Sequence, residues 1–298
     1  MRVVFSAQFR QAADEINRTA ADLAAAQRLV SSGRRIARAS DDPAGASAAI
    51  TDHATLGALD AYTQTADTTT SRLTMVDSTL ADIINKITAA QTAVASARGS
   101  VPNQSQRDAA AANLQAISDS LLSDFNSQVH GAYLFSGSLA TTAAYTKGGG
   151  GIVSAYQGNV TTMSVDIGQG RPLQMTFDGS SIAKGSDPSD IFSVLSTLIT
   201  DVKAGNAAGM STGLDALGRA LDRTTLVQSQ VGASLKTLDD ARARLSAQQL
   251  DTKALLSKTE DANMASAITQ MSQADTAYRA ALGAFSKVAS VSLMDYLR

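Results

Sequence analysis

The sequence predicts a mainly α-helical protein: an elongated antiparallel coiled coil or helical bundle formed by N- and C-terminal arms, with a small β-rich inserted domain. Three observations predict this fold class. Neither glycine nor proline occurs between Ala233 and Leu282, so a continuous helix of roughly 75 Å is expected there. Apolar residues recur every seven positions near both ends of the chain, as in coiled coils. Eleven of the 21 glycines lie between Gly131 and Gly185, where the apolar period falls to two.

The composition argues against several classes of protein. The 25 basic and 27 acidic residues nearly cancel, so we expect no partner among nucleic acids and no membrane. The chain has no cysteine and two histidines, so we also expect no metal and no cofactor. No apolar run approaches the ~20 residues needed to span a bilayer. Arg10, Asp14 and Glu15 come too early for a cleaved signal peptide.

The first helix is expected to run from the start of the chain to Gly33, which suits a helix C-cap. Its apolar face is a heptad line with two residues beside it: Phe9, Ile16, Leu23 and Val30, flanked by Phe5 and Ala12. Asp42 is expected to cap the next helix, because a residue before proline avoids helical dihedrals and Pro43 suits the first helical position.

The second helix has the most regular pattern in the chain. Its residues at seven-residue spacing are Leu59, Ala66, Leu73, Leu80, Ile87 and Val94. A third helix, about residues 106–129, is expected to fold back on the second.

Residues 131–186 are expected to form the β-rich insert. Met163–Ile167 and Leu173–Phe177 alternate apolar and polar residues across two glycines and predict a hairpin. Tyr133–Ser136 and Ile152–Tyr156 predict weaker strands. Because the composition changes so sharply at both borders, we expect the arms to fold without the insert.

Helix is expected to resume at Asp187-Pro188 and to pass through a link broken by Gly205, Gly209 and Gly213 into the C-terminal rod. The apolar line near the C-terminus consists of Met264, Ile268, Met271, Tyr278, Leu282 and Phe285. We expect both terminal apolar lines to form subunit interfaces. One pair of short helices buries too little to offset the ordering entropy of roughly 1–2 kcal/mol per residue, so both ends should order on assembly.

Two patterns that could signal catalysis are better explained otherwise. Gly209–Gly213 matches the G-x-S-x-G nucleophile elbow around Ser211, but no core strand precedes it and no histidine follows. The Gly148–Gly151 run lacks the lysine and hydroxyl that should follow a phosphate loop. His53 and His130 have no ligand set nearby and are expected to be structural or solvated. We therefore expect no catalytic site.

Arg34, Arg35 and Arg38 form a short basic cluster. Asp41 and Asp42 follow within two turns, so local ion pairing is expected, and a contact between subunits stays open.

Four segments carry a resemblance to a known family: residues 31–36 with 39–46 (SSGRRI and ASDDPAGA), 131–137 (GAYLFSG), 257–265 (SKTEDANMA) and 292–297 (SLMDYL). They resemble motifs of the flagellin superfamily of bacterial axial proteins, and the 131–137 and 292–297 segments are similar to its hook–filament junction branch. The motif residues are Asp41, Asp42, Pro43, Glu260, Asp261, Leu293, Asp295 and Tyr296.

The resemblance implies a structural subunit of the bacterial flagellum that joins the hook to the flagellin filament, and not an enzyme. It implies a homo-oligomeric ring, contacts with another hook-associated protein and with flagellin, and an export chaperone on the C-terminal segment. It also implies an extracellular location reached by type III export. We expect residues 1–40 with 258–298 to form a terminal coiled coil, and residues 41–130 with 187–257 a helical rod.

Three alternatives stay open. A flagellin-type filament subunit would share the motifs, and Met294 and the terminal Arg298 depart toward it from the junction pattern. A hydrolase would depend on Ser211 alone. A secreted coiled-coil adhesin would share the heptads but not the Asp41-Asp42-Pro43 motif or the C-terminal motifs.

Overall fold

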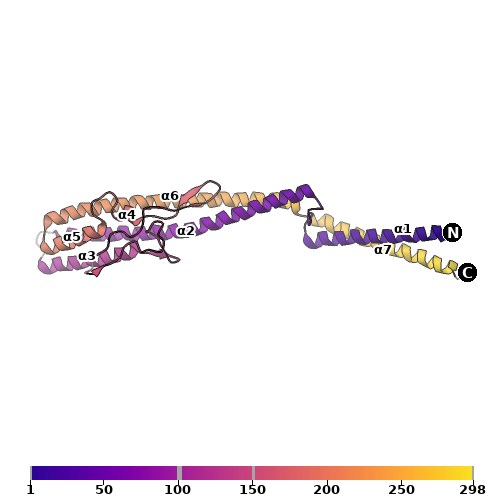
Figure 1. Cartoon of the computed structure of the whole chain (residues 1–298), viewed down its shortest axis with the longest axis horizontal. Coiled ribbons are helices and arrows are strands. Elements are labelled where there is room, and N and C mark those ends of the chain that lie inside the picture. The colour runs from indigo at the N-terminus through magenta and orange to yellow at the C-terminus, as the bar shows by residue number, and fades with distance from the viewer. Residues whose placement is uncertain (1, 99–102, 150–151, 297–298) are drawn as a thin grey trace. The chain divides into compact units, whose positions relative to one another are not determined.

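The computed structural model describes residues 2–98, 103–149 and 152–296, and the side chains of residues 9–287 within these ranges. The chain forms two compact units: a terminal unit of residues 1–58 with 247–298, and a central unit of residues 59–246. The elements in chain order are α1 (Arg2–Ser32), α2 (Pro43–Ala97), α3 (Gln104–Phe125), β1 (Gln128–Val129), β2 (Ala132–Tyr133), β3 (Ser164–Asp166), β4 (Pro172–Gln174), α4 (Gly179–Ala183), α5 (Ile191–Ala204), α6 (Ala207–Glu260) and α7 (Met264–Tyr296). Figure 1 labels the helices. The predicted mainly helical fold with a small β-containing region is confirmed.

The core of the central unit is built on the heptad line of α2. All six predicted positions, Leu59, Ala66, Leu73, Leu80, Ile87 and Val94, are buried. Helix α6 has a matching buried line at the same spacing: Met210, Leu217, Thr224, Val231, Leu238 and Leu245. The one polar member, Thr224, donates its hydroxyl to the carbonyl oxygen of Ala220 at 2.7 Å, so its burial leaves no donor unpaired.

The region between α3 and α5 holds two small antiparallel sheets. The predicted hairpin is confirmed: β3 pairs with β4, and Val165 faces Leu173. Strand β2 covers the start of the predicted Tyr133–Ser136 strand and pairs with β1. The predicted Ile152–Tyr156 strand is wrong, because in its described residues only Val153 forms a bridge, to Lys147.

The insert shares the core of the helices, so its removal would expose apolar side chains of the helical arms. That the arms fold without the insert stays a prediction. Tyr145 of the insert is buried against Phe125 of α3 and Phe192 of α5, with ring centroids 5.5 and 4.9 Å apart. Arg72 of α2 donates to the carbonyl oxygens of Tyr133 and Met175 at 3.2 Å each. The glycine-rich composition therefore indicates irregular backbone, not a separate body.

The predicted glycine-broken link is shorter than expected. Of the three glycines in this link, only Gly205 ends a helix, with a left-handed φ of 72°. Helix α6 already begins at Ala207. Gly209 and Gly213 lie inside α6 where it packs on α5. A Cβ atom on Gly213 would lie 2.3 Å from the Leu198 side chain, so glycine permits a close approach of the two helices here.

In the terminal unit, α1 and α7 lie side by side (Figure 1). The prediction of one continuous helix from residue 233 to 282 is wrong, because α6 ends at Glu260 and α7 begins at Met264. The side chain of Asn263 accepts a hydrogen bond from the Ser266 amide at 3.2 Å and caps the new helix. Backbone hydrogen bonds between the break and residues 33–36 stabilise the non-helical conformation. Because these residues are distant in the sequence, no local pattern near residue 260 predicts the break.

Candidate assembly interface

The connection between α1 and α2 is anchored to the break between α6 and α7. The Arg35 amide donates to the carbonyl oxygen of Glu260 at 2.7 Å, and the Ala262 amide donates to that of Gly33 at 2.8 Å. Arg34 and Asp261 form an antiparallel bridge between these bonds. Gly33 has a φ of 67° and ends α1 as predicted, so the chain leaves the helix directly into this pairing.

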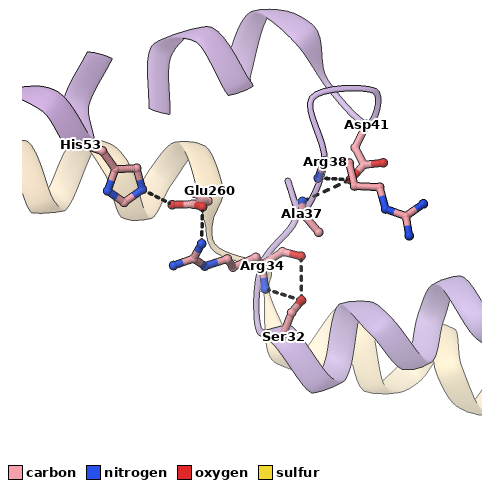
Figure 2. A network of polar contacts seen from close by, with 7 residues as sticks. All are labelled: Ser32, Arg34, Ala37, Arg38, Asp41, His53 and Glu260. Carbon is pink, nitrogen blue, oxygen red and sulfur yellow. Dashed lines mark hydrogen bonds and ion pairs between the residues drawn. The ribbon is translucent and has the colours of Figure 1, made fainter. Parts of the chain in front are cut away.

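Glu260 is the centre of a polar network that joins three segments (Figure 2). One carboxylate oxygen lies 2.8 Å from Arg34 Nη1, and the other lies 3.0 Å from His53 Nε2 of α2. The Glu260 side chain is only 10% exposed, so these two contacts take the place of hydrogen bonds to water. The two contacts hold α2, the connection and the end of α6 together.

The paired aspartates of the motif have different roles. Asp42 caps α2 as predicted, because its Oδ1 accepts a hydrogen bond from the Gly45 amide at 3.0 Å. The Gly45 amide and the Arg35 side chain lower the pKa of Asp42. Asp41 Oδ2 instead accepts bonds from the amides of Ala37 and Arg38 at 3.1 and 2.8 Å, which fixes the turn before the helix.

The predicted local ion pairing of the three arginines holds for one of them. Arg35 Nη1 lies 3.1 Å from Asp42 Oδ2, and its other terminal nitrogen donates to the carbonyl oxygen of Thr259 at 2.7 Å, near the end of α6. The prediction is wrong for Arg34, which pairs with Glu260 instead. It is also wrong for Arg38, whose guanidinium is directed away from the network in Figure 2 and has no partner among the described residues.

Gly45 of the motif is required by close packing. A Cβ atom at this position would lie 2.5 Å from the Asp42 carboxylate and 2.5 Å from the Ile36 side chain. Ile36 is 6% exposed and is the largest buried apolar side chain among those described in the terminal unit. A larger residue at 45 would therefore disturb both the cap and this small core.

The C-terminal motif, residues 257–265, contains the non-helical break between α6 and α7. The Ser257 hydroxyl donates to Asp261 Oδ2 at 2.6 Å, and the Asp261 amide donates to the carbonyl oxygen of Ser257 at 3.0 Å. Asp261 thus closes α6, while Glu260 pairs with Arg34 and His53. The role of His53 could not be found by sequence reasoning, since 207 residues separate it from Glu260.

The predicted terminal apolar lines divide into a seam and an exposed face. Half-buried positions are Ile16, Leu23 and Val30 of α1 and Met271, Tyr278 and Phe285 of α7. The ring of Phe9 packs on that of Phe285 with centroids 5.0 Å apart, yet Phe9 is 46% exposed. The exposed positions on α7 are Met264, Ile268 and Leu282. Phe5, Leu293, Asp295 and Tyr296 lie outside the described side chains.

A groove of about 590 Å³ lies between the C-terminal half of α1, the connection and α7. Its charged lining residues are Asp22, Arg28, Arg34, Arg35, Arg38 and Asp41. Basic side chains outnumber acidic ones, so the groove favours an acidic ligand or surface.

The nucleophile elbow considered at Ser211 gains no support from the structure, and Gly150 and Gly151 of the glycine run lie outside the described residues. Ser211 lies inside α6, without the strand and sharp turn that expose the serine of a nucleophile elbow. Within the described ranges, no three acidic or histidine side chains gather as metal ligands would. Nor does the described part of the chain contain a helix long and apolar enough to cross a membrane.

Both ends of the chain match models of one family. Residues 7–140 match the bacterial flagellin N-terminal helical region, and residues 214–297 match the bacterial flagellin C-terminal helical region. The two matched stretches together include more than two thirds of the 298 residues.

Three individual proteins illustrate the similarity. Flagellar hook-associated protein 3 of Salmonella typhimurium is 23% identical over the full length of both chains, and that of Escherichia coli is 24% identical over 89% of each. The crystal structure of flagellar hook associated protein-3 from Legionella pneumophila matches with a TM-score of 0.63 and 14% identity, covering 70% of this chain and 98% of that one. The structural match shows a shared fold.

Proposed function

Because the chain belongs to the bacterial flagellin family, we infer that it is a structural subunit of the bacterial flagellum that joins the hook to the filament. The single observation that carries this inference is its full-length match to a hook-associated protein, not to the terminal helical regions alone. The flagellin family consists of structural proteins, which agrees with the absence of an elbow at Ser211.

We propose that the subunits form a ring through the terminal unit. The support is the apolar surface left exposed on its helices, chiefly Ile268 at 51% and Phe9 at 46%. Such faces are costly in a lone chain and suit contact with neighbouring copies. The exposed line comprises Phe9, Met264, Ile268 and Leu282.

The partners on either side of the ring are, by the same proposal, another hook-associated protein and flagellin. Subunits would reach the site by type III export without a cleaved signal, with a chaperone bound to the C-terminal segment until export. A chaperone would cover the apolar face of α7 before assembly and so prevent early association.

A deletion strain tests the function. Cells lacking the chain should keep their hooks but release flagellin monomers into the medium, and a plasmid copy should restore attached filaments. Hooks that still carry a complete junction, with the amount of filament protein merely reduced, would make the chain a flagellin-type filament subunit instead. Activity of the purified chain on short ester substrates, lost in Ser211→Ala, would contradict the structural role.

A further inference from the structure

The groove of the terminal unit contains two arginines whose guanidinium groups have no partner among the residues that the structure describes. Arg34 and Arg35 are occupied by Glu260 and Asp42, whereas no described residue pairs with the guanidinium of Arg28 or Arg38. Both of the unpaired arginines are exposed and line the groove from different segments, α1 and the connection. Two unpaired guanidinium groups that line one groove are suited to bind a carboxylate.

The charge is distributed unevenly along this part of the sequence. Residues 2–38 contain seven arginines and three acidic residues, while residues 39–71 contain five aspartates and neither lysine nor arginine. The first stretch forms α1 and the basic wall of the groove. The second stretch forms the turn and the start of α2, so a basic and an acidic surface are carried by different elements.

Of the five aspartates, four already have partners. Asp41 and Asp42 bind backbone amides, Asp67 lies 2.7 Å from Arg242, and Asp60 also has an interaction. For Asp52 no such partner is found across the described residues, and this carboxylate does not line the groove. Asp52, which is half-buried, is thus the acidic side chain of this segment that has no partner among the described residues.

We propose that the groove of one copy receives the start of α2 of a second copy, where Asp52 binds Arg38 and Arg28. This inference rests on the ring of the proposed function and names the charged contact between its subunits. The two surfaces differ, so the contact is head-to-tail, and a head-to-tail contact can close into a ring. Apolar contacts between the helices of neighbouring copies would alone permit one copy to slide along the other. The charged contact would fix the position of each copy relative to the next.

Cross-linking between two differently labelled copies tests the contact. The chain has no cysteine, so Ala37→Cys beside the groove and Ala48→Cys one turn before Asp52 each supply a unique thiol. The full-length copies are mixed, both as concentrated purified chain and in assembled flagella, and treated with a short bismaleimide. We expect a mixed 37–48 dimer, and little product when Ala21→Cys of α1, which does not line the groove, replaces Ala37→Cys.

Charge exchange between the copies decides whether the contact depends on these side chains. Arg38→Glu in the groove copy should lower the mixed-dimer yield about tenfold, and Asp52→Arg in the other copy should restore it. Arg18→Glu, which removes an exposed arginine outside the groove, should leave the yield unchanged. No mixed dimer in either sample, an unchanged yield in Arg38→Glu, or no rescue by Asp52→Arg would overturn the proposal.

Cells that carry the cross-linking variants distinguish a failure of this inference from a failure of the proposed function. Attached filaments without the 37–48 dimer would overturn the charged contact and leave the junction role intact. The dimer in a chain that cannot restore attached filaments would support the contact and overturn the junction role. Cross-linking of Ala37→Cys to a different flagellar protein, with no mixed dimer, would show that another partner occupies the groove.

Discussion

The central and terminal units are both helical, but they are stabilised in different ways. The largest fully buried side chains described, among them Phe125, Tyr145 and Leu80, all belong to the central unit. In the terminal unit the buried apolar side chains are small except for one: Ala26, Ile36, Ala46, Ala49 and Ala267 among those described. Polar contacts of Glu260 with Arg34 and His53 also join the segments of this unit.

This difference shows that helix formation and stability need not go together. Buried apolar area contributes roughly 25 cal/mol per Å², so the central unit has a large driving force of its own and the terminal unit a small one. Helices that bury only one narrow seam depend on further surfaces for stability. The central unit therefore resembles a conventional folded domain, whereas the terminal unit has only a narrow buried seam.

Amide hydrogen exchange on a proven monomer should reveal the largest contrast. We expect fast exchange in residues 1–32 and 264–298, because each helix has only one packed seam, and strong protection in residues 59–94. Mass spectrometry of peptides would measure both in one sample. Strong protection of residues 16–30 in the monomer would contradict the expected instability of the terminal unit. Assembled flagella are the matched control, in which the amides of both ends should become protected.

Phenylalanine truncation should affect the two units very differently. Phe125→Ala removes a fully buried ring from the aromatic cluster and should lower the free energy of unfolding by about 3–5 kcal/mol. Phe9→Ala removes a ring that is 46% exposed and should change the same value by less than about 1 kcal/mol. Urea unfolding followed by circular dichroism measures the free energy of unfolding of both variants. Losses of equal size would contradict the difference in buried core between the two units.

High pH should destabilise the central unit specifically. Burial raises the pKa of Tyr156 to about 12, and burial also raises the pKa of Tyr145. An unfolded tyrosine has a pKa of about 10, so the unfolded state loses its proton first. The resulting stability is present below pH 10 and is lost as the pH rises from about 10 towards 12.

Thermal unfolding at a series of pH values, with phenolate absorbance recorded in parallel, tests this. Tyr145→Phe should have a smaller decrease in melting temperature over the same range. Full ionisation of all tyrosines before any helical signal is lost would contradict the prediction.

Helix caps should have the smallest effects and should still distinguish the units. Asp190 caps α5 in the central unit through the Ser193 amide at 2.8 Å, so Asp190→Ala should lower the free energy of unfolding by about 1 kcal/mol.

Asp42→Ala should leave this global transition unchanged and should increase amide exchange locally at the start of α2. Because the pKa of Asp42 is lowered, its contribution is present above the pKa of the unfolded carboxyl group and is lost as the pH falls. A global loss in Asp42→Ala would connect the two units energetically.

Local patterns were sufficient to predict the features that depend on neighbouring residues. The heptads of α2, the Asp42 cap and the hairpin of β3 with β4 follow from spacing and dihedral preference. Each of these is decided within one helix or one hairpin, so no knowledge of distant segments was needed.

The errors concern contacts between distant segments. Gly209 and Gly213 look like helix breakers, yet they allow α6 to approach α5 closely. The break after Glu260 contains neither glycine nor proline and is held by backbone bonds to residues more than 200 positions away. Tyr145 lies in a glycine-rich stretch, and only its burial against Phe125 shows that this stretch belongs to the core.

The paired chain segments at Arg34 and Asp261 also determine how the terminal unit responds to force. Both chain connections at this level are non-helical, so no continuous helix crosses it, and we expect the terminal unit to bend most easily there. Load applied to the α1–α7 pair must pass through a few short backbone bonds and the ion pair of Glu260. We therefore expect this level to yield under load before the helices on either side of it bend.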